Sequence, residues 1–228
     1  MLKWYFDTWC KIMFRPIYFF TLMPEGEWTE EPVSFAAISS WIVAAVLSCV
    51  IFITQYIPIG VTLVGGISGM KFLIIFPVLL LLSFMFFLIT FVISGGMLMV
   101  AFFCLFYALG YILHYALKFA GGKGRLADTV KSSFYSSGVV VFGVIPLILA
   151  MIVKRDILTF GFFMVGYNII YFMAALYYYG LISIAVKKCE HLSKGKALVF
   201  GVLPLAVFVL LGIFVNKYLL PAIEPFLS

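Results

Sequence analysis

The sequence predicts an all-α fold, namely a polytopic transmembrane helical bundle. The chain has 228 residues, of which 65% are hydrophobic and only 11% are charged. Soluble domains are about 45–50% apolar and about 25% charged, so this chain has too little polar surface to cover a core in water. Its apolar residues also gather into five long runs, separated by short polar segments. Lipid is therefore the expected solvent, and a single membrane domain over residues 1–228 is the expected organisation.

An N-terminal amphipathic helix is predicted over residues 1–20. Such a helix suits the membrane interface, with its cations near lipid phosphates; a helix packed over the bundle is the alternative. Pro16 is expected to end or bend it, and the acidic, proline-containing segment 24–32 is expected to be a loop. The charged side chains recur every four residues and so share one side of the helix: Lys3, Asp7, Lys11 and Arg15.

The five apolar runs are predicted to cross the membrane. Four of them suit a single crossing, which needs about 20 residues. The remaining run, 72–119, would form a helix of about 72 Å, against about 30 Å for a hydrocarbon core. We therefore expect it to break at Gly95-Gly96 into a broken or re-entrant helix pair, with one long, tilted and kinked helix as the alternative. The runs cover about residues 33–59, 72–119, 133–153, 157–186 and 197–220.

The distribution of lysine and arginine favours five net crossings. With five crossings, eleven basic residues share one side of the membrane and four share the other; with six crossings the split is nine against six. Cytoplasmic loops carry the excess of basic residues in membrane proteins. The five-crossing arrangement therefore predicts a cytoplasmic N-terminus and an external C-terminus, and a cell inner or plasma membrane is the expected location.

Two basic loops gather on the predicted cytoplasmic face, one after the helix that ends near Phe119 and one after the fourth apolar run. Loop amides and cations together suit an anion, so we interpret these loops as a surface for anionic lipid headgroups or for a partner protein. The alternative is that their charges only orient the chain in the membrane. The candidate residues are Gly121, Gly122, Lys123, Gly124, Arg125, Lys131, Lys187, Lys188, His191, Lys194 and Lys196.

No catalytic or metal-binding constellation is visible in the sequence. The glycine-rich turn 121–125 is not a phosphate-binding Walker motif, because no strand precedes it and no Ser or Thr follows its lysine. His191 stands beside Glu190, but neighbours on a helix point about 100° apart and make no catalytic pair. His114 is expected at the membrane interface. We therefore expect no enzyme activity, no cofactor, no metal and no nucleic-acid partner.

A transporter, permease subunit or lipid scramblase is the alternative function. Glycine and proline residues interrupt the predicted spans and motivate it. All nine Asp and Glu residues, however, lie in loops or near span ends, whereas ion-coupled transporters use ionisable groups near the middle of the membrane. Asn168, at the centre of its span, is the residue type that more often links helices; an exposed groove lined by Asn168 and serines would favour transport.

The segment 119–146 resembles a hallmark of the Yip family, membrane proteins named for interacting with Ypt/Rab GTPases. It has a GGKG turn, a linking segment, the pair Tyr135-Ser136 and a proline-containing span. Segments 184–203 and Arg15 to Phe20 are similar to further Yip elements. The resemblance implies five spans, a cytoplasmic N-terminus and a non-enzymatic role, and it adds Tyr135 to the candidate residues. The chain lacks the long polar N-terminal region of eukaryotic members and so looks like a compact prokaryotic type, for which Rab binding is not implied.

Overall fold

The computed structural model describes residues 2–23, 27–65, 70–155 and 157–227. These residues form helices and turns, with no strand among them. Five helices are long and apolar enough to cross a membrane, which confirms the predicted fold class. Each of them overlaps one of the five predicted apolar runs. The spanning helices are Glu31–Val64, Leu73–Phe119, Leu126–Val153, Phe160–Cys189 and Lys194–Pro225.

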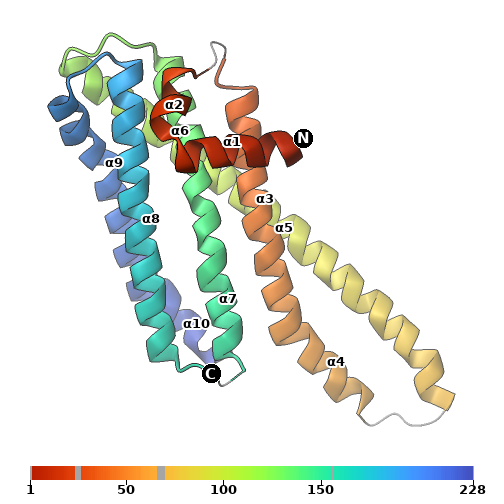
Figure 1. Cartoon of the computed structure of the whole chain (residues 1–228). Coiled ribbons are helices and arrows are strands. Elements are labelled where there is room, and N and C mark those ends of the chain that lie inside the picture. The colour runs from red at the N-terminus through yellow and green to blue at the C-terminus, as the bar shows by residue number, and fades with distance from the viewer. Residues whose placement is uncertain (1, 24–26, 66–69, 156, 228) are drawn as a thin grey trace.

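The five spans alternate in direction, so the two chain ends lie at opposite ends of the bundle (Figure 1). Three of the spans are composites that change helix type along their length. The first comprises α3 (Glu31–Ile51), the π-helix η1 (Phe52–Tyr56) and α4 (Ile57–Val64), and the second is α5 (Met70–Phe119). The third comprises α6 (Leu126–Ser136), the 3-10 helix η2 (Ser137–Gly143) and α7 (Val144–Val153). The fourth is α8 (Phe160–Cys189), and the fifth comprises α9 (Lys194–Phe214), the π-helix η3 (Val215–Leu219) and α10 (Leu220–Leu227).

The N-terminal helix α1 (Leu2–Phe14) lies crosswise over the bundle and is followed at Pro16 by the short helix α2 (Pro16–Thr21) (Figure 1). Tyr5 and Ile12 are buried, while the four charged side chains of the predicted polar side are exposed. The helix is thus packed on the protein, as in the alternative stated above. Its hydrogen bonds reach three elements: Tyr5 and the Ser39 hydroxyl lie 2.9 Å apart, Trp9 Nε1 donates to Gly138 O at 2.9 Å, and Tyr177 OH donates to Met13 O.

Helix α5 does not break at Gly95-Gly96, so that prediction was wrong. The helix runs without interruption through 50 residues and includes Pro77 in its interior. Gly95 instead lies against an aromatic ring, because a Cβ atom there would meet Trp41 Cζ3 at 2.2 Å. The glycine therefore lets α3 and α5 approach closely, and the alternative of one long helix is the one that the structure supports.

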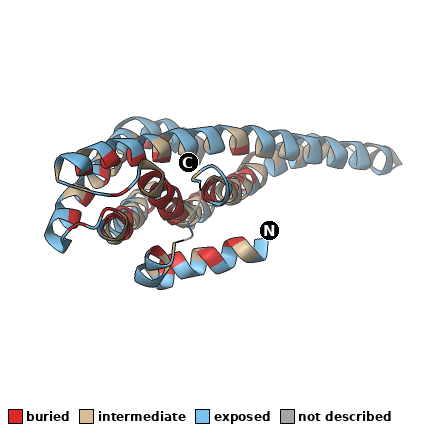
Figure 2. Ribbon diagram, turned by 90° about the horizontal axis from the view of Figure 1, so that it is seen from above, coloured by how far each residue is buried: buried red, intermediate tan, exposed pale blue. Residues whose placement is uncertain are grey.

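The core lies where α5, α6 and α8 meet, near the end of the bundle that carries the two basic loops. Phe106 and Leu113 from α5, Phe134 from α6 and Ile182 from α8 are almost completely buried. At Gly110 a Cβ atom would lie 2.9 Å from the Val130 Cα, so the backbones of α5 and α6 nearly touch. Figure 2 shows the outer arm of the α3–α5 hairpin as almost continuously exposed and the buried residues concentrated in the bundle.

Candidate functional site

A buried carboxylate joins the two basic loops. Glu190 follows the last residue of α8 and is fully buried. Its Oε1 accepts a hydrogen bond from Thr129 Oγ1 at 2.7 Å and lies 3.0 Å from His114 Nδ1. Its Oε2 accepts from the Gly124 backbone amide at 2.7 Å. We call Glu190, His114, Thr129 and Gly124 the Glu190 cluster. A buried carboxylate is tolerable only when it is paired and hydrogen-bonded in this way.

The glycine-rich turn is shaped by Glu190. A Cβ atom at Gly122 would lie 2.7 Å from Glu190 Oε2, and one at Gly124 would lie 2.5 Å from Cys189 O. Gly121 has a φ of +88°, a backbone conformation that glycine adopts without the steric cost of a side chain. Lys118 Nζ also donates to Gly124 O at 2.9 Å. The turn thus wraps around a carboxylate of its own chain, and this explains Gly122 and Gly124 without a bound phosphate.

A polar cavity of about 400 Å³ lies beside the Glu190 cluster. We call it the loop-end pocket. It is bounded by the start of α6, by the end of α8 with the loop that follows, and by α2 with the segment after it. Its lining residues are Phe20, Met23, Lys123, Gly124, Arg125, Asp128, Lys188, Cys189 and His191.

The loop-end pocket carries three cations and one carboxylate. Arg125 is held by that carboxylate, with Nε 3.0 Å from Asp128 Oδ2 and an Nη 3.2 Å from Oδ1. The ion pairs of the described residues join Glu190 to His114 and Asp128 to Arg125 and Lys131. The ammonium groups of Lys123 and Lys188 therefore have no carboxylate partner in the described part of the chain. The N-terminus of α6 at the same wall adds the positive end of a helix dipole.

Five of the twelve sequence-predicted residues line this pocket, and three of the others have structural roles instead. Lys131 is buried, with its Nζ 3.8 Å from Asp128 Oδ1. Tyr135 is buried and donates to Glu31 Oε2 at 3.4 Å, beside α1. Lys196 Nζ donates to Ala120 O at 2.9 Å, just past the end of α5. Gly121 and Gly122 form the turn, and Lys187 and Lys194 are exposed at the same end of the molecule.

Sequence reasoning missed the Glu190 cluster. It gave His114 no partner, although the histidine is buried in the protein. It compared Glu190 only with its neighbour His191, which is exposed and has a φ of +53°. The available signal was an acidic residue directly after a long apolar span, since a charge there needs a partner. The partners lie 61 to 76 residues away along the chain, so no local pattern shows them.

The loop-end pocket brings together cations that suit an anion. Among the residues that the structure describes, no three His, Cys, Asp or Glu side chains gather to hold a metal ion. Both carboxylate oxygens of Glu190 already interact with groups of the same chain. Comparison of the chain with protein-family models, with curated proteins and with solved structures finds no match.

Proposed function

We propose that this protein is a non-enzymatic integral membrane protein that binds anionic lipid headgroups in the loop-end pocket, on the cytoplasmic side of a cell inner or plasma membrane. The carrying observation is the pair Lys123 and Lys188, two unpaired cations on the wall of one polar cavity. The resemblance to the Yip family supports the same non-enzymatic role. The chemistry fits a phosphate group near the membrane surface, where each basic residue contributes about 1 kcal/mol toward anionic lipid.

The position of the pocket supports a lipid in preference to a soluble anion. Phe20 belongs to α2 and Met23 follows it, and both present apolar side chains to the same cavity as the cations. A phospholipid has both kinds of surface, with a charged headgroup above an apolar chain. The Arg125 guanidinium is already paired with the Asp128 carboxylate. Lys123 and Lys188 are therefore the principal headgroup ligands.

The test compares two charge-matched double variants of the whole chain in zwitterionic detergent. One is Lys123→Gln with Lys188→Gln, and its control is Lys187→Gln with Lys194→Gln, which removes two exposed cations at the same end. Binding of phosphatidylglycerol relative to phosphatidylcholine is measured by native mass spectrometry. We expect the pocket variant to lose about tenfold or more of the preference for phosphatidylglycerol, at about 1 kcal/mol per lysine. An equal loss in both double variants would mean that the charges act only as a diffuse field.

The proposed orientation has its own test. Glu224→Cys, in a chain without the four native cysteines, places a thiol on the exposed face of α10. A membrane-impermeant thiol reagent applied to intact cells should label it, because the excess of basic residues lies at the opposite end of the bundle. Labelling only after the membrane is opened would overturn the five-crossing orientation.

The transport alternative depended on a groove lined by Asn168 and serines. A groove beside Asn168 does exist between α8 and α9, but no serine lines it. Asn168 Oδ1 accepts a hydrogen bond from Asn216 Nδ2 at 2.8 Å, which is the helix-linking role expected of it. The structure therefore gives headgroup binding the stronger support.

A further inference from the structure

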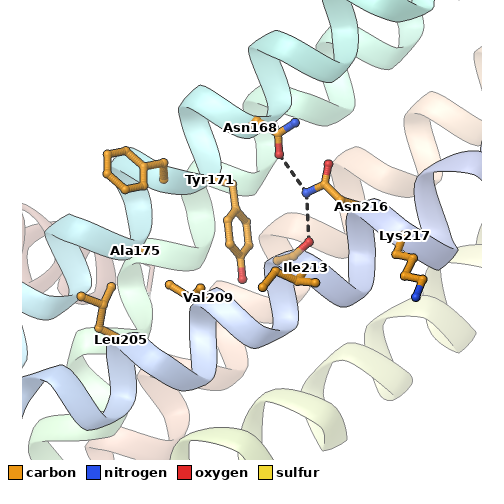
Figure 3. Close-up of a pocket in the computed structure, with 10 residues that line it drawn as sticks. Asn168, Tyr171, Ala175, Leu205, Val209, Ile213, Asn216 and Lys217 are labelled. Atoms are coloured by element: carbon orange, nitrogen blue, oxygen red, sulfur yellow. Dashed lines mark hydrogen bonds between the residues drawn. The ribbon is translucent and has the colours of Figure 1, made fainter.

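The surface between α8 and α9 carries a groove at the end of the bundle opposite the loop-end pocket. It has a volume of about 580 Å³, and we call it the α8/α9 groove. On α9 and η3, Leu205, Val209 and Asn216 line it at intervals that keep them on one helix face. Figure 3 shows these residues following one another along the helix, with Lys217 at the far end and Asn168 on the facing helix α8.

Small residues and satisfied polar groups give the groove an apolar interior. A Cβ atom at Gly212 would lie 2.6 Å from Tyr171 Cε1, so the ring of Tyr171 fits only because this position has no side chain. The Tyr171 hydroxyl donates to the Phe208 carbonyl at 2.5 Å and leaves its ring to face the groove. The amide of Asn216 donates both to Asn168 Oδ1 and to Gly212 O, which closes one end of the groove with polar atoms.

The dimensions of the groove match one leaflet of a membrane. From Leu205 to Asn216 the helix rises about 17 Å, close to half of a hydrocarbon core of about 30 Å. Helix α8 has 30 residues and rises about 45 Å, enough to cross the core and both headgroup layers. Asn168 then lies about 12 Å from the start of α8, slightly below the headgroup layer and not at the centre of the span, where the sequence predicted it.

The charge at the end of the groove indicates what occupies it. Lys217 is exposed and lines the polar end of the groove. The Lys217 Nζ lies 5.4 Å from the centre of the Tyr218 ring. A lysine at this depth can extend its ammonium group into the headgroup layer while its stem stays among apolar groups. It is one of only four basic residues on this side in the five-crossing arrangement, so it is not part of a general basic surface.

We propose that the α8/α9 groove is a phospholipid site: one acyl chain lies along Val209 and Tyr171, and the lipid phosphate pairs with Lys217. The site belongs to the leaflet at the C-terminal end of the bundle. It shares no residue with the loop-end pocket, and it does not depend on that pocket binding anionic lipid.

The experiment uses the whole chain in nanodiscs that contain a photoactivatable phosphatidylcholine with a diazirine on its acyl chain. A diacylglycerol with the same labelled chain serves as the probe without a phosphate. After illumination, labelled peptides are identified by mass spectrometry. We expect the phosphatidylcholine probe to label the groove-lining parts of α8 and α9 several-fold more than the exposed half of α5, and more than the diacylglycerol probe does.

Two pairs of variants separate the contributions of the chain and of the phosphate. Val209→Trp fills the groove and should remove most groove labelling by both probes, whereas Val199→Trp, at an exposed position on α9 outside the groove, should not. Lys217→Gln should lower labelling by phosphatidylcholine about fivefold, to the level of diacylglycerol, while Arg155→Gln at the same end leaves it unchanged. The proposal is overturned if labelling is uniform over the lipid-facing helices, or if each variant behaves like its control. A zwitterionic probe keeps this result independent of the loop-end pocket.

Discussion

The two halves of helix α5 are both strongly apolar but lie in opposite environments. In the second half, Phe106, Leu113 and Leu117 are fully buried against α6 and α8. In the first half, side chains such as Leu81 and Ile93 are more than half exposed, and the most apolar 18-residue window of the span has no buried residue. Figure 1 shows this half leaving the bundle together with α4.

The difference shows that small and polar residues, and not hydropathy, decide where these helices associate. Lipid is as apolar as leucine, so helices pair in a membrane through close packing and hydrogen bonds. The buried half of α5 has Gly110 against α6 and His114 in the Glu190 cluster. The exposed half has contacts of this kind along its α3–α4 side, where Tyr56 OH and Thr90 Oγ1 lie 3.0 Å apart.

The largest expected effect comes from removing the carboxylate that secures the buried half. Glu190→Ala leaves the buried His114 ring, the Thr129 hydroxyl and the Gly124 amide without their shared acceptor. We expect a loss of about 3–5 kcal/mol in the free energy of unfolding, measured by denaturant titration in mixed micelles. Glu30→Ala, an exposed carboxylate near the start of α3, is the control. Equal stability of the two variants would show that the cluster does not hold the loops together.

The second effect tests the two halves of α5 directly. Leu113 is 1% exposed and Leu81 is 61% exposed. Leu113→Ala leaves a cavity among α5, α6 and α8 and should cost about 2–4 kcal/mol. Leu81→Ala should change stability by less than about 0.5 kcal/mol, because lipid fills the space. A comparable loss at Leu81 would indicate that a partner covers the exposed half.

A third comparison separates two adjacent glycines in the middle of α5. Gly95→Leu places a side chain where Trp41 already lies, and we expect a loss of about 1–3 kcal/mol in stability. A Cβ atom at Gly96 has nothing within 4 Å, so Gly96→Leu should be neutral or stabilising by about 0.5–1 kcal/mol through helix propensity. Thermal unfolding in detergent measures both. The same response from the two variants would mean that Trp41 does not pack on α5.

The smallest effect concerns how α1 is fastened over the bundle. Tyr5→Phe removes the hydrogen bond to Ser39 and should cost about 0.5–1.5 kcal/mol at neutral pH. Burial raises the pKa of the Tyr5 phenol above 10.0, and the hydrogen bond to Ser39 offsets this in part. The phenol therefore ionises first in the unfolded chain, and its contribution to stability is complete below pH 10 and declines above it. Unfolding measured between pH 9 and pH 11 should show a smaller decline for Tyr5→Phe than for the unmodified chain.

Much of the architecture follows from the order of residues along the chain. Long apolar runs fix the five spans, because each backbone polar group in lipid must be satisfied within a helix. The four-residue spacing of Lys3, Asp7, Lys11 and Arg15 similarly identifies the exposed side of α1. The glycine-rich turn was expected to bind an anion through its loop amides and cations. In the structure the Gly124 amide donates to a carboxylate of the same chain, that of Glu190.

The break expected at Gly95-Gly96 shows where such reasoning ends. A glycine pair permits a bend, but a helix in lipid bends only if its neighbours favour the bend, and here Trp41 packs across the glycine. The length of the 72–119 run was the reason for expecting a break. A long apolar helix can instead fit a bilayer by tilting.

The sequence by itself determined that this chain is helical and which segments are long and apolar enough to cross a membrane. These properties depend on hydropathy and periodicity, which are local and additive. Only the tertiary structure decided that Glu190 meets His114 and Thr129, that Lys123 and Lys188 share a pocket while Lys131 is buried, and that one half of α5 packs while the other is left exposed. Those outcomes depend on contacts between residues far apart in the chain. In lipid such contacts form through close packing and hydrogen bonding, and the hydropathy of a segment predicts neither.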